Sequence, residues 1–383
     1  MRTSNLYESG PGGHPRIYLS PPDTGERERE AVLGALESGW VAPVGPDLDG
    51  FEADLALLTG WPGVAAVSSG TAALHLALLV SGVQPGDEVL VSTFTFAASA
   101  NAVVHAGGAP VFVDSDRETW NVDPHLLADV LDERARTNRL PRAVVVTDLY
   151  GQCADYEAIV PLCRDLGVAV VEDAAEAVGS TSGGRAAGTL ADIGIYSFNG
   201  NKIITTSSGG AVLSPDPAVA DRVRYLATQA RQPVVHYEHT DVGFNYRLSN
   251  LLAALGRAQL SRLPELTAAR LAVHAGYRQA LADDVEFMPL ADTQHWNGWL
   301  TCILTPCAAS RDRVLAALAT QNVEGRPLWK PLHQQPVYAS NRSYVTGVSD
   351  DLFTRGVCLP SGSTLSPDSV DRIGGLVRSA LRD

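Results

Sequence analysis

Lysine is almost absent from this sequence. Lys202 and Lys330 are the only lysines in a chain of 383 residues that has 29 lysines and arginines in total. An arginine stays protonated, whereas the ammonium of a lysine, with an ordinary pKa of about 10.4, can lose its proton in a suitable environment. A lysine that arginine cannot replace is one whose free amine attacks a carbonyl, as a Schiff-base lysine does. Lys202 is the stronger candidate because it lies between Ser197 and the pair Gly209-Gly210.

Two carboxylates stand upstream of that lysine. The apolar run 168–171 follows Gly167 and ends in Glu172 and Asp173, a pattern typical of a buried parallel strand. In open α/β sheets, ligands bind at the C-terminal ends of the strands. A carboxylate there and a lysine later in the chain suit pyridoxal phosphate (PLP). Asp173 would keep the pyridine nitrogen protonated, and Lys202 would carry the aldehyde as an imine.

A third feature could bind the phosphate of such a cofactor. A short strand predicted over 64–68 is followed by the small residues Ser69, Gly70, Thr71 and Ala72, which lead directly into a helix. Small residues at such a turn leave backbone N–H groups exposed at the positive end of the helix, where an anion binds. Small residues also begin many buried helices, so this signal depends on the carboxylate and lysine motifs that follow it.

Two apolar segments could either contact a ligand or pack in the core, and the sequence leaves both roles open. Phe94 and Phe96 follow the strand predicted over 88–92, and one of them could cover a planar ring. The loop 40–46, which contains Gly45, is rich in apolar residues, Gly and Pro, and could line a ligand pocket.

Strands and helices alternate over most of the chain. Strands are predicted over 88–92, 109–114, 142–147, 168–173, 193–197 and 210–214, and helices over 25–38, 48–60, 95–107, 123–134, 247–260 and 263–281. Repeated βαβ units predict an α/β fold with a mainly parallel central sheet and helices on both faces. We expect disorder over 1–15, a large domain with connecting helices over 16–284, and a smaller α+β domain over 285–383.

Composition narrows the class of protein. The net charge of −14 and the dispersed arginines argue against a nucleic-acid partner, which needs a basic stripe. The five cysteines are odd in number and contain no CxxC pair, which predicts buried thiols in a reducing compartment and no metal site. No signal peptide and no apolar run of membrane-spanning length occur, so we expect a cytoplasmic enzyme with no membrane partner.

Six motifs together resemble one family, the DegT-type nucleotide-sugar aminotransferases, which are PLP enzymes of the aspartate-aminotransferase fold (fold type I). The likeness covers nearly the whole chain beyond residue 15. The motifs are 69–74, Thr95-Phe96 with Asn101, 148–151, 172–175, Ser197-Phe198 ahead of Lys202, and 243–247.

This resemblance implies a role for each matched residue. Lys202 would bind the cofactor aldehyde, Asp173 would pair with the pyridinium nitrogen, and Phe96 would stack on the ring. The phosphate would be held by the backbone of Gly70, Thr71 and Ala72, by the Ser197 hydroxyl, and by Asn245 from the other subunit of a homodimer with shared active sites.

Glu176 departs from the residue that the family often has near the phenolic oxygen of the cofactor. Gln or His is frequent there, whereas a branch acting on 4-keto-6-deoxy sugars also has Glu. Two anionic oxygens repel each other, so a shared proton or a raised Glu176 pKa is needed. The segments 197–206, 326–333 and 358–362 resemble the same branch.

Four residues are candidate substrate contacts: Gly45, Tyr150, Lys330 and His333. Lys330 and His333 would lie at the sugar or the diphosphate, because lysine binds phosphate as a point charge. The alternative is that they cap or pair with other groups of the protein.

The predicted reaction is transfer of the amino group of L-glutamate to the C-4 ketone of a nucleotide-linked 4-keto-6-deoxyhexose. The alternatives are amination at C-3, a UDP-linked 2-acetamido sugar, a PLP dehydratase, and a non-catalytic regulator of the same fold. Lys202 argues against the dehydratase, since that branch has histidine in its place. The preference for Arg over Lys suggests a GC-rich genome, where such enzymes often serve antibiotic sugars, and favours dTDP.

Overall fold

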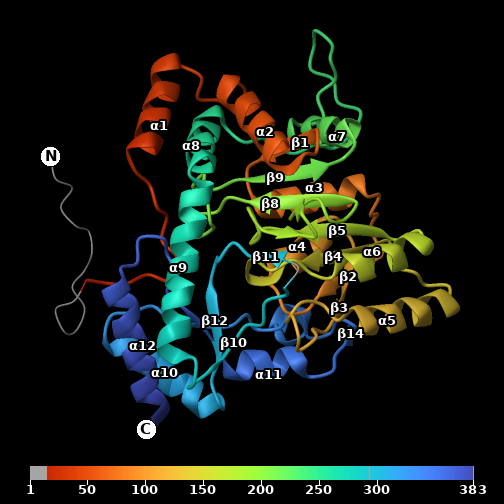
Figure 1. Cartoon of the computed structure of the whole chain (residues 1–383). Coiled ribbons are helices and arrows are strands. Elements are labelled where there is room, and N and C mark those ends of the chain that lie inside the picture. Colours follow the sequence, from red (N-terminus) through yellow and green to blue (C-terminus); the bar gives the residue numbers. More distant parts are fainter. Residues whose placement is uncertain (1–14, 293, 383) are drawn as a thin grey trace.

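An eight-stranded sheet forms the centre of the computed structural model, which describes residues 15–292 and 294–382 (Figure 1). Its order is β1-β9-β8-β5-β4-β2-β3-β14. The strands from β8 to β14 are parallel, and β9 is antiparallel to both of its neighbours. Their bounds are β1 Gly63–Val67, β2 Glu88–Ser92, β3 Ala109–Val113, β4 Ala143–Thr147, β5 Ala169–Asp173, β8 Ile193–Ser197, β9 Gly210–Ser214 and β14 Ser343–Tyr344. The predicted α/β fold with a mainly parallel sheet is confirmed.

Helices cover both faces of this sheet, as predicted. Side chains alternate along a strand, so Val144 and Val146 of β4 pack in one apolar cluster and Val145 packs in the other. One cluster contains residues of α2, α5 and α6, and the other contains residues of α3, α4 and α7. The helices are α1 Glu26–Ser38, α2 Pro46–Thr59, α3 Gly70–Val80, α4 Ala98–His105, α5 Pro124–Arg136, α6 Tyr156–Asp165, α7 Pro217–Ala227, α8 Asn250–Ser261 and α9 Leu263–Leu281.

Some element ends differ from the sequence prediction. The helix predicted from 247 begins at Asn250, because the Ser249 hydroxyl caps it by accepting the Leu252 N–H at 3.3 Å. The helix predicted over 95–107 is shorter, and Thr95 and Phe96 remain outside it, where they line a cavity.

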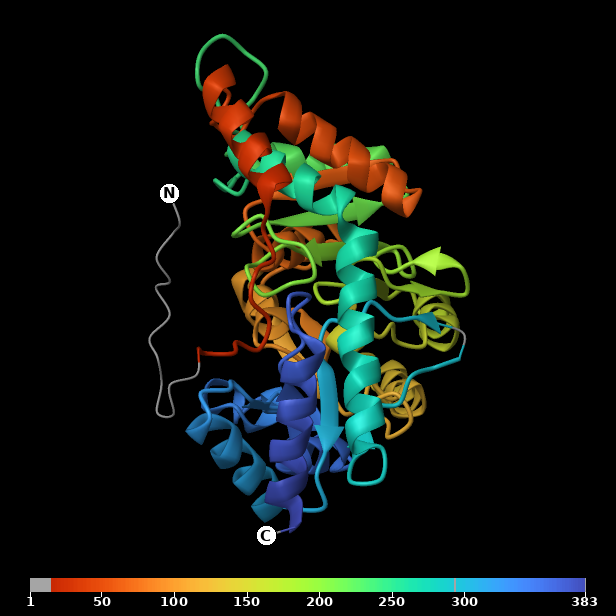
Figure 2. The same ribbon diagram turned by 60° about the vertical axis from the view of Figure 1, so that its left-hand side comes forward.

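A second sheet is formed by the C-terminal part of the chain and lies towards the C-terminal end of the long helix α9 (Figure 2). Its order is β10-β12-β15-β13, and α10 and α12 pack against each other beside it. The elements are β10 Glu286–Phe287, β12 Thr301–Leu304, α10 Ala308–Thr320, β13 Arg326–Pro327, α11 Val348–Arg355, β15 Gly356–Leu359 and α12 Pro367–Arg382. β14 comes from the same part of the chain but pairs with β3 of the large sheet. The domain boundary at 284/285 therefore stays a prediction.

Shorter elements complete the fold. A three-stranded sheet contains β11 Gln294–His295, β6 Thr181–Ser182 and β7 Arg185–Ala186, and the 3₁₀ turns are Leu149–Gly151, Leu332–Gln334 and Pro336–Tyr338. Of residues 1–15, for which we predicted disorder, residues 1–14 lie outside the described residues. Within the described residues, no helix is both long and apolar enough to cross a membrane.

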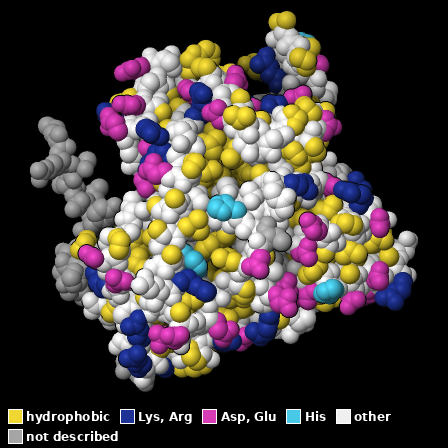
Figure 3. Space-filling model, viewed as in Figure 1, with side chains coloured by type: hydrophobic (Ala, Val, Ile, Leu, Met, Phe, Trp, Pro, Cys, Tyr) yellow, Lys and Arg dark blue, Asp and Glu magenta, His cyan; other side chains and the backbone are white. Residues whose placement is uncertain are grey.

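The molecular surface carries charges of both signs. On the face shown in Figure 3, Lys and Arg side chains are scattered among acidic ones and form no stripe. All five cysteines are free, and Cys307 is the exposed one, whereas buried thiols were predicted. A loop around 231–240 stands out from the body near α7 (Figure 1), and hydrophobic side chains lie at its tip among polar ones (Figure 3).

Candidate active site

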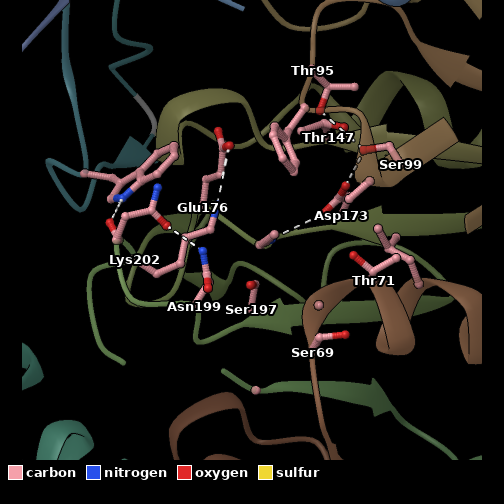
Figure 4. Close-up of a pocket in the computed structure, with 18 of the residues that line it drawn as sticks. Ser69, Thr71, Thr95, Ser99, Thr147, Asp173, Glu176, Ser197, Asn199 and Lys202 are labelled. Carbon is pink, nitrogen blue, oxygen red and sulfur yellow. Dashed lines mark hydrogen bonds and ion pairs between the residues drawn. The ribbon is translucent and has the colours of Figure 1, made fainter. Parts of the chain in front are cut away.

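A cavity of about 280 Å³ lies at the C-terminal ends of the parallel strands (Figure 4). The ends of β4, β5 and β8 contribute Thr147, Asp173 and Ser197 to its wall, and the start of α3 closes one side. The chain reverses direction at these strand ends, so side chains that are distant in sequence meet there. Lys202 and Asp173, the two residues that the sequence singled out first, both line this cavity and lie on opposite sides of it.

Lys202 extends into the cavity from the loop between β8 and β9. The Lys202 N–H donates to the Asn199 carbonyl at 3.0 Å, which fixes a tight turn at this point. Its Nζ lies 3.6 Å from Oε1 of Glu176 and 4.2 Å from the centroid of the Trp299 ring. The side chain is only 12% exposed. The amine is therefore held between a carboxylate and an aromatic face, shielded from bulk water.

Asp173 is the last residue of β5 and is buried. One oxygen accepts the Ser99 hydroxyl at 2.6 Å, and the other accepts the Ala175 N–H at 3.3 Å. Burial raises the pKa of Asp173, while the Ser99 hydrogen bond and the charge of Lys202 oppose the increase. A buried carboxylate oriented in this way can pair with a protonated ring nitrogen.

Glu176 is the second buried acid of the cavity. Its Oε2 accepts the Tyr150 N–H at 2.7 Å. Burial is the largest influence and raises the Glu176 pKa to about 7, against the opposing effects of Lys202 and the Tyr150 N–H. Asp173 lies close enough to add to the increase. Near neutral pH this group can therefore both give and accept a proton.

The N-terminus of α3 forms the other end of the cavity. Ser69 caps the helix by accepting the Ala72 N–H at 3.0 Å. A Cβ at Gly70 would lie 2.7 Å from Cβ of Ser197, so only glycine allows the helix to approach β8 this closely. The first N–H groups of a helix have no intrahelical acceptor, and those of Gly70 and Thr71 lie at the cavity wall. The arrangement suits a phosphate.

These groups match the chemistry of PLP. The cavity combines an amine for the aldehyde, a buried carboxylate for the ring nitrogen and a helix N-terminus for the phosphate. The close contact at Gly70 is the structural observation that supports this fit, because the absence of a Cβ there lets the first turn of α3 lie beside Ser197 at the cavity wall.

Comparison with known proteins agrees with this geometry. The model of the DegT/DnrJ/EryC1/StrS aminotransferase family matches residues 22–378. The chain belongs to this family. It is therefore a PLP-dependent sugar aminotransferase, and the predicted fold, enzyme class and cofactor are confirmed.

Three similar proteins illustrate the relationship. The Bacillus subtilis protein EpsN is 46% identical over 366 residues, which cover 94% of each chain. GDP-perosamine synthase of Caulobacter vibrioides is 36% identical over 364 residues, covering 94% of this chain and 96% of the relative. The solved structure of the aminotransferase TlmJ from Streptoalloteichus hindustanus has a TM-score of 0.88 at 34% identity, covering 96% and 99% of the two chains.

The structure separates the two phenylalanines that the sequence left undecided. Phe94 is buried in an apolar cluster. Phe96 lines the cavity, is 54% exposed, and lies 5.4 Å from the Trp329 ring between centroids. In this aminotransferase, Phe96 is therefore the ring that can cover the cofactor.

Tyr150 is placed outside the cavity. Its backbone φ is +51°, an uncommon value for a residue with a side chain. The ring is fully buried between Trp299 and Trp329, and its hydroxyl accepts the backbone N–H of Trp329 at 2.9 Å. Tyr150 therefore stabilises the positions of the Trp299 and Trp329 rings and, through its backbone N–H, orients Glu176.

His333 has both ring nitrogens occupied by the protein. Nδ1 lies 2.8 Å from the Thr93 hydroxyl, and Nε2 lies 2.9 Å from Oδ1 of Asp350. This is the structural pairing that the sequence analysis left open as the alternative to substrate contact.

Lys330 lies on a second cavity, of about 800 Å³, which shares Asn201 and Trp329 with the first. This cavity lies between the segment 18–22 and the C-terminal part of the chain.

The remaining predicted residues, Gly45, Ala72 and Asn245, line neither cavity. Gly45 is buried at the start of α2, where a Cβ would lie 2.6 Å from the Asn250 side chain. Ala72 does not line the cavity, and its N–H donates to the Ser69 hydroxyl. Asn245 is exposed, and its backbone forms an isolated antiparallel β-bridge with Thr228.

Sequence reasoning missed several residues of the cavity wall, namely Ser99, Thr147, Asn199, Asn201, Trp299 and Trp329. Asn199, Asn201 and Trp329 stand inside motifs that the sequence singled out, so proximity to Lys202 and Lys330 was an available signal. Ser99 and Thr147 carry no comparable signal.

Proposed function

We propose that this aminotransferase moves the amino group of L-glutamate to the C-4 ketone of a nucleotide-linked 4-keto-6-deoxyhexose. The product is a 4-amino-4,6-dideoxy sugar nucleotide. The observation that carries the proposal is the pair of adjoining cavities, because a sugar at Lys202 can continue into the larger cavity as a nucleotide diphosphate. The choice of C-4 is supported by the segments 326–333 and 358–362, which resemble the branch acting on 4-keto-6-deoxy sugars.

The residues of the small cavity have distinct tasks in this reaction. PLP, when bound, supplies an aldehyde that carries the amino group and a ring that accepts electrons. Lys202 would hold the aldehyde and would move a proton at C-4 of the sugar as general acid and base. Asp173 would keep the ring nitrogen protonated. Phe96 would cover the ring and exclude water, while Gly70 and Thr71 would hold the phosphate.

The larger cavity suits a nucleotide diphosphate. Pro21, Leu300 and Phe353 form apolar parts of its wall, where a base can pack. Arg326 forms an ion pair with Glu324 at 2.8 Å, whereas Lys330 is exposed at the rim. A lysine at this point can bind the diphosphate as a point charge.

The nucleotide is proposed to be dTDP, on the strength of the arginine preference noted above. GDP is the second candidate, because a relative at 36% identity is named GDP-perosamine synthase. A UDP-linked 2-acetamido sugar is the third substrate to compare.

We also propose that the enzyme is a cytoplasmic homodimer with shared active sites. Asn245 lies outside the cavity of its own chain, in agreement with the resemblance that places it at the phosphate of the partner. Val235, Tyr237 and Val242 of the neighbouring loop are strongly exposed apolar residues, which a second subunit would cover.

A turnover assay tests the proposed reaction. Purified enzyme is incubated with L-glutamate and 4-keto-6-deoxy sugars linked to dTDP, GDP or UDP, and the product is identified by mass and NMR. We expect a 4-amino product, with the dTDP substrate preferred and with no turnover in Lys202→Ala or Lys202→Arg. An amine at C-3, or turnover retained without the lysine amine, contradicts the proposal.

Lys330→Ala tests whether Lys330 binds the diphosphate of the sugar nucleotide. Loss of one charge-assisted contact, worth about 1.5–3 kcal/mol, predicts an increase in KM for the sugar nucleotide of about tenfold or more. The half-reaction with glutamate should not change. An equal loss in both half-reactions contradicts this placement.

A further inference from the structure

Two buried acids that the reaction does not use lie behind the active site. Asp148 follows β4, and Glu172 lies in β5, next to Asp173; both acids are fully buried. Side chains alternate along a strand, so Glu172 is on the opposite face of the sheet from Asp173. Asp148 and Glu172 share that face and are within hydrogen-bonding reach of each other.

Glu172 is surrounded by hydrogen-bond donors. Its Oε1 accepts the Gly188 N–H, and its Oε2 accepts the N–H groups of Leu190 at 2.6 Å and Ala191 at 3.3 Å. Three backbone donors favour the ionised form of a carboxyl group. Burial opposes them and raises the Glu172 pKa to about 7.

Asp148 has a different environment. Oδ1 accepts the Ala154 N–H at 3.1 Å and the Tyr156 hydroxyl at 2.9 Å. Oδ2 is buried and accepts no hydrogen bond from the described residues. Burial and the neighbouring Glu172 raise the pKa of Asp148 well above its ordinary value. The unsatisfied Oδ2 is explained if it carries a hydrogen and donates it.

Among the residues that the structure describes, the other titratable groups facing the pair do not supply a positive charge. They are Cys153, Tyr156 and Tyr196, and burial raises the pKa of each, so all three stay neutral. Two adjacent carboxylates cannot both ionise in such surroundings. The hydrogen bonds indicate which of the two acids keeps the proton. Three backbone N–H groups stabilise an ionised Glu172, whereas Oδ2 of Asp148 accepts no hydrogen bond from the described residues.

We propose that Asp148 is a neutral acid whose Oδ2–H donates to the Glu172 carboxylate, and that this hydrogen bond positions the cofactor-binding acids on the other face of the sheet. Asp148 and Glu172 are positioning residues. The hydrogen stays bonded to Asp148 throughout, and no group is oxidised or transferred.

Two short links connect this hydrogen bond to the cavity. The Asp148 N–H donates to the carbonyl of Asp173 at 3.0 Å, so the backbone at the pyridinium partner is tied to Asp148 itself. Two residues later, the Tyr150 N–H donates to Glu176 at 2.7 Å. A change in the direction of the chain at Asp148 would therefore move both acids of the cavity.

Isosteric substitutions separate the two acids. In Asp148→Asn, the amide NH2 can donate to Glu172 and the amide oxygen can accept from Ala154 and Tyr156, so the arrangement is kept. In Glu172→Gln, an NH2 group replaces one oxygen that accepts backbone N–H groups, so at least one N–H loses its acceptor. The measurement is the dissociation constant of PLP, by titration of the apo protein at a temperature where each variant is folded.

We expect PLP affinity within about twofold of wild type for D148N, and a loss of about tenfold or more for E172Q, because displacement of Asp173 would cost PLP about one charge-assisted contact. A purely structural role would lower the melting temperature of E172Q and leave the PLP affinity of the folded protein unchanged, which overturns the proposal. The opposite order, with E172Q tolerated and D148N impaired, places the proton on Glu172 and also overturns it, as do two tolerated or two impaired variants.

A second measurement does not depend on the stability of E172Q. The infrared carbonyl band of protonated carboxyl groups, recorded for the apo protein above pH 8, should lose intensity in D148N relative to wild type. A band of unchanged intensity in D148N shows that Asp148 is not the neutral acid.

Discussion

Replacing Glu176 with Gln tests the electrostatics of the cavity directly. The substitution keeps an oxygen that can accept the Tyr150 N–H and removes the ability to ionise. The folded-state pKa of Glu176 is raised from 4.5 to about 7, mainly by burial. The groups that face it are Lys202, Asp173, Tyr150 and Cys302.

The sign and size of the effect follow from proton linkage. Below pH 4.5 the carboxyl group is protonated in both the folded and the unfolded chain, and it makes no difference to stability. Between pH 4.5 and about 7 the unfolded chain releases this proton first, so the free energy of unfolding falls as pH rises. At about 1.4 kcal/mol per pH unit, the wild type loses about 3 kcal/mol of its free energy of unfolding over this range, and Glu176→Gln does not lose it.

Urea unfolding of the apo proteins between pH 4 and pH 9 measures this difference. We expect the stability of Glu176→Gln relative to wild type to increase by about 3 kcal/mol across this range and to level off above pH 8. Glu118→Gln at an exposed position is the control, and its curve should run parallel to that of the wild type. Parallel curves for Glu176→Gln and wild type would refute the argument that burial sets the protonation of this acid.

Two other substitutions test the neighbouring contacts. Ser99→Ala removes the 2.6 Å hydrogen bond to the buried Asp173 carboxylate. Because such a bond contributes about 1.5–3 kcal/mol, we expect PLP binding to weaken by about tenfold or more in a spectroscopic titration. Unchanged affinity would contradict the role given to this contact. Gly70→Ala places a Cβ 2.7 Å from Cβ of Ser197 and should cost about 1–3 kcal/mol of stability together with PLP affinity. Gly34→Ala, in a helix with no atom within 4 Å of the new Cβ, is the matched control and should stabilise the protein by about 0.5–1 kcal/mol. Equal effects of the two glycine substitutions on thermal unfolding and on PLP binding would contradict the close approach of α3 to β8.

The order of strands and helices could be predicted from the sequence because it depends on local patterns. Apolar runs such as 168–171 are buried on both faces in any parallel sheet, and Ser69 and Ser249 cap helices through contacts three residues away. The antiparallel direction of β9 and the return of β14 to the large sheet depend on contacts between distant segments, which no local pattern contains.

The residues of the active site divide in the same way. The sequence by itself predicted Lys202 and Asp173 as the amine and the acid, because the chemistry requires both groups and the strand pattern places that acid at a binding edge, and the structure brings the two residues to one cavity. Only the tertiary structure decided that Tyr150 and His333 are held by other protein groups, that Lys330 borders a second cavity, and that Ser99 and Trp299 contact Asp173 and Lys202. The physical reason is that a side chain's partners depend on packing between elements far apart in the sequence, whereas its chemical capacity belongs to the residue alone.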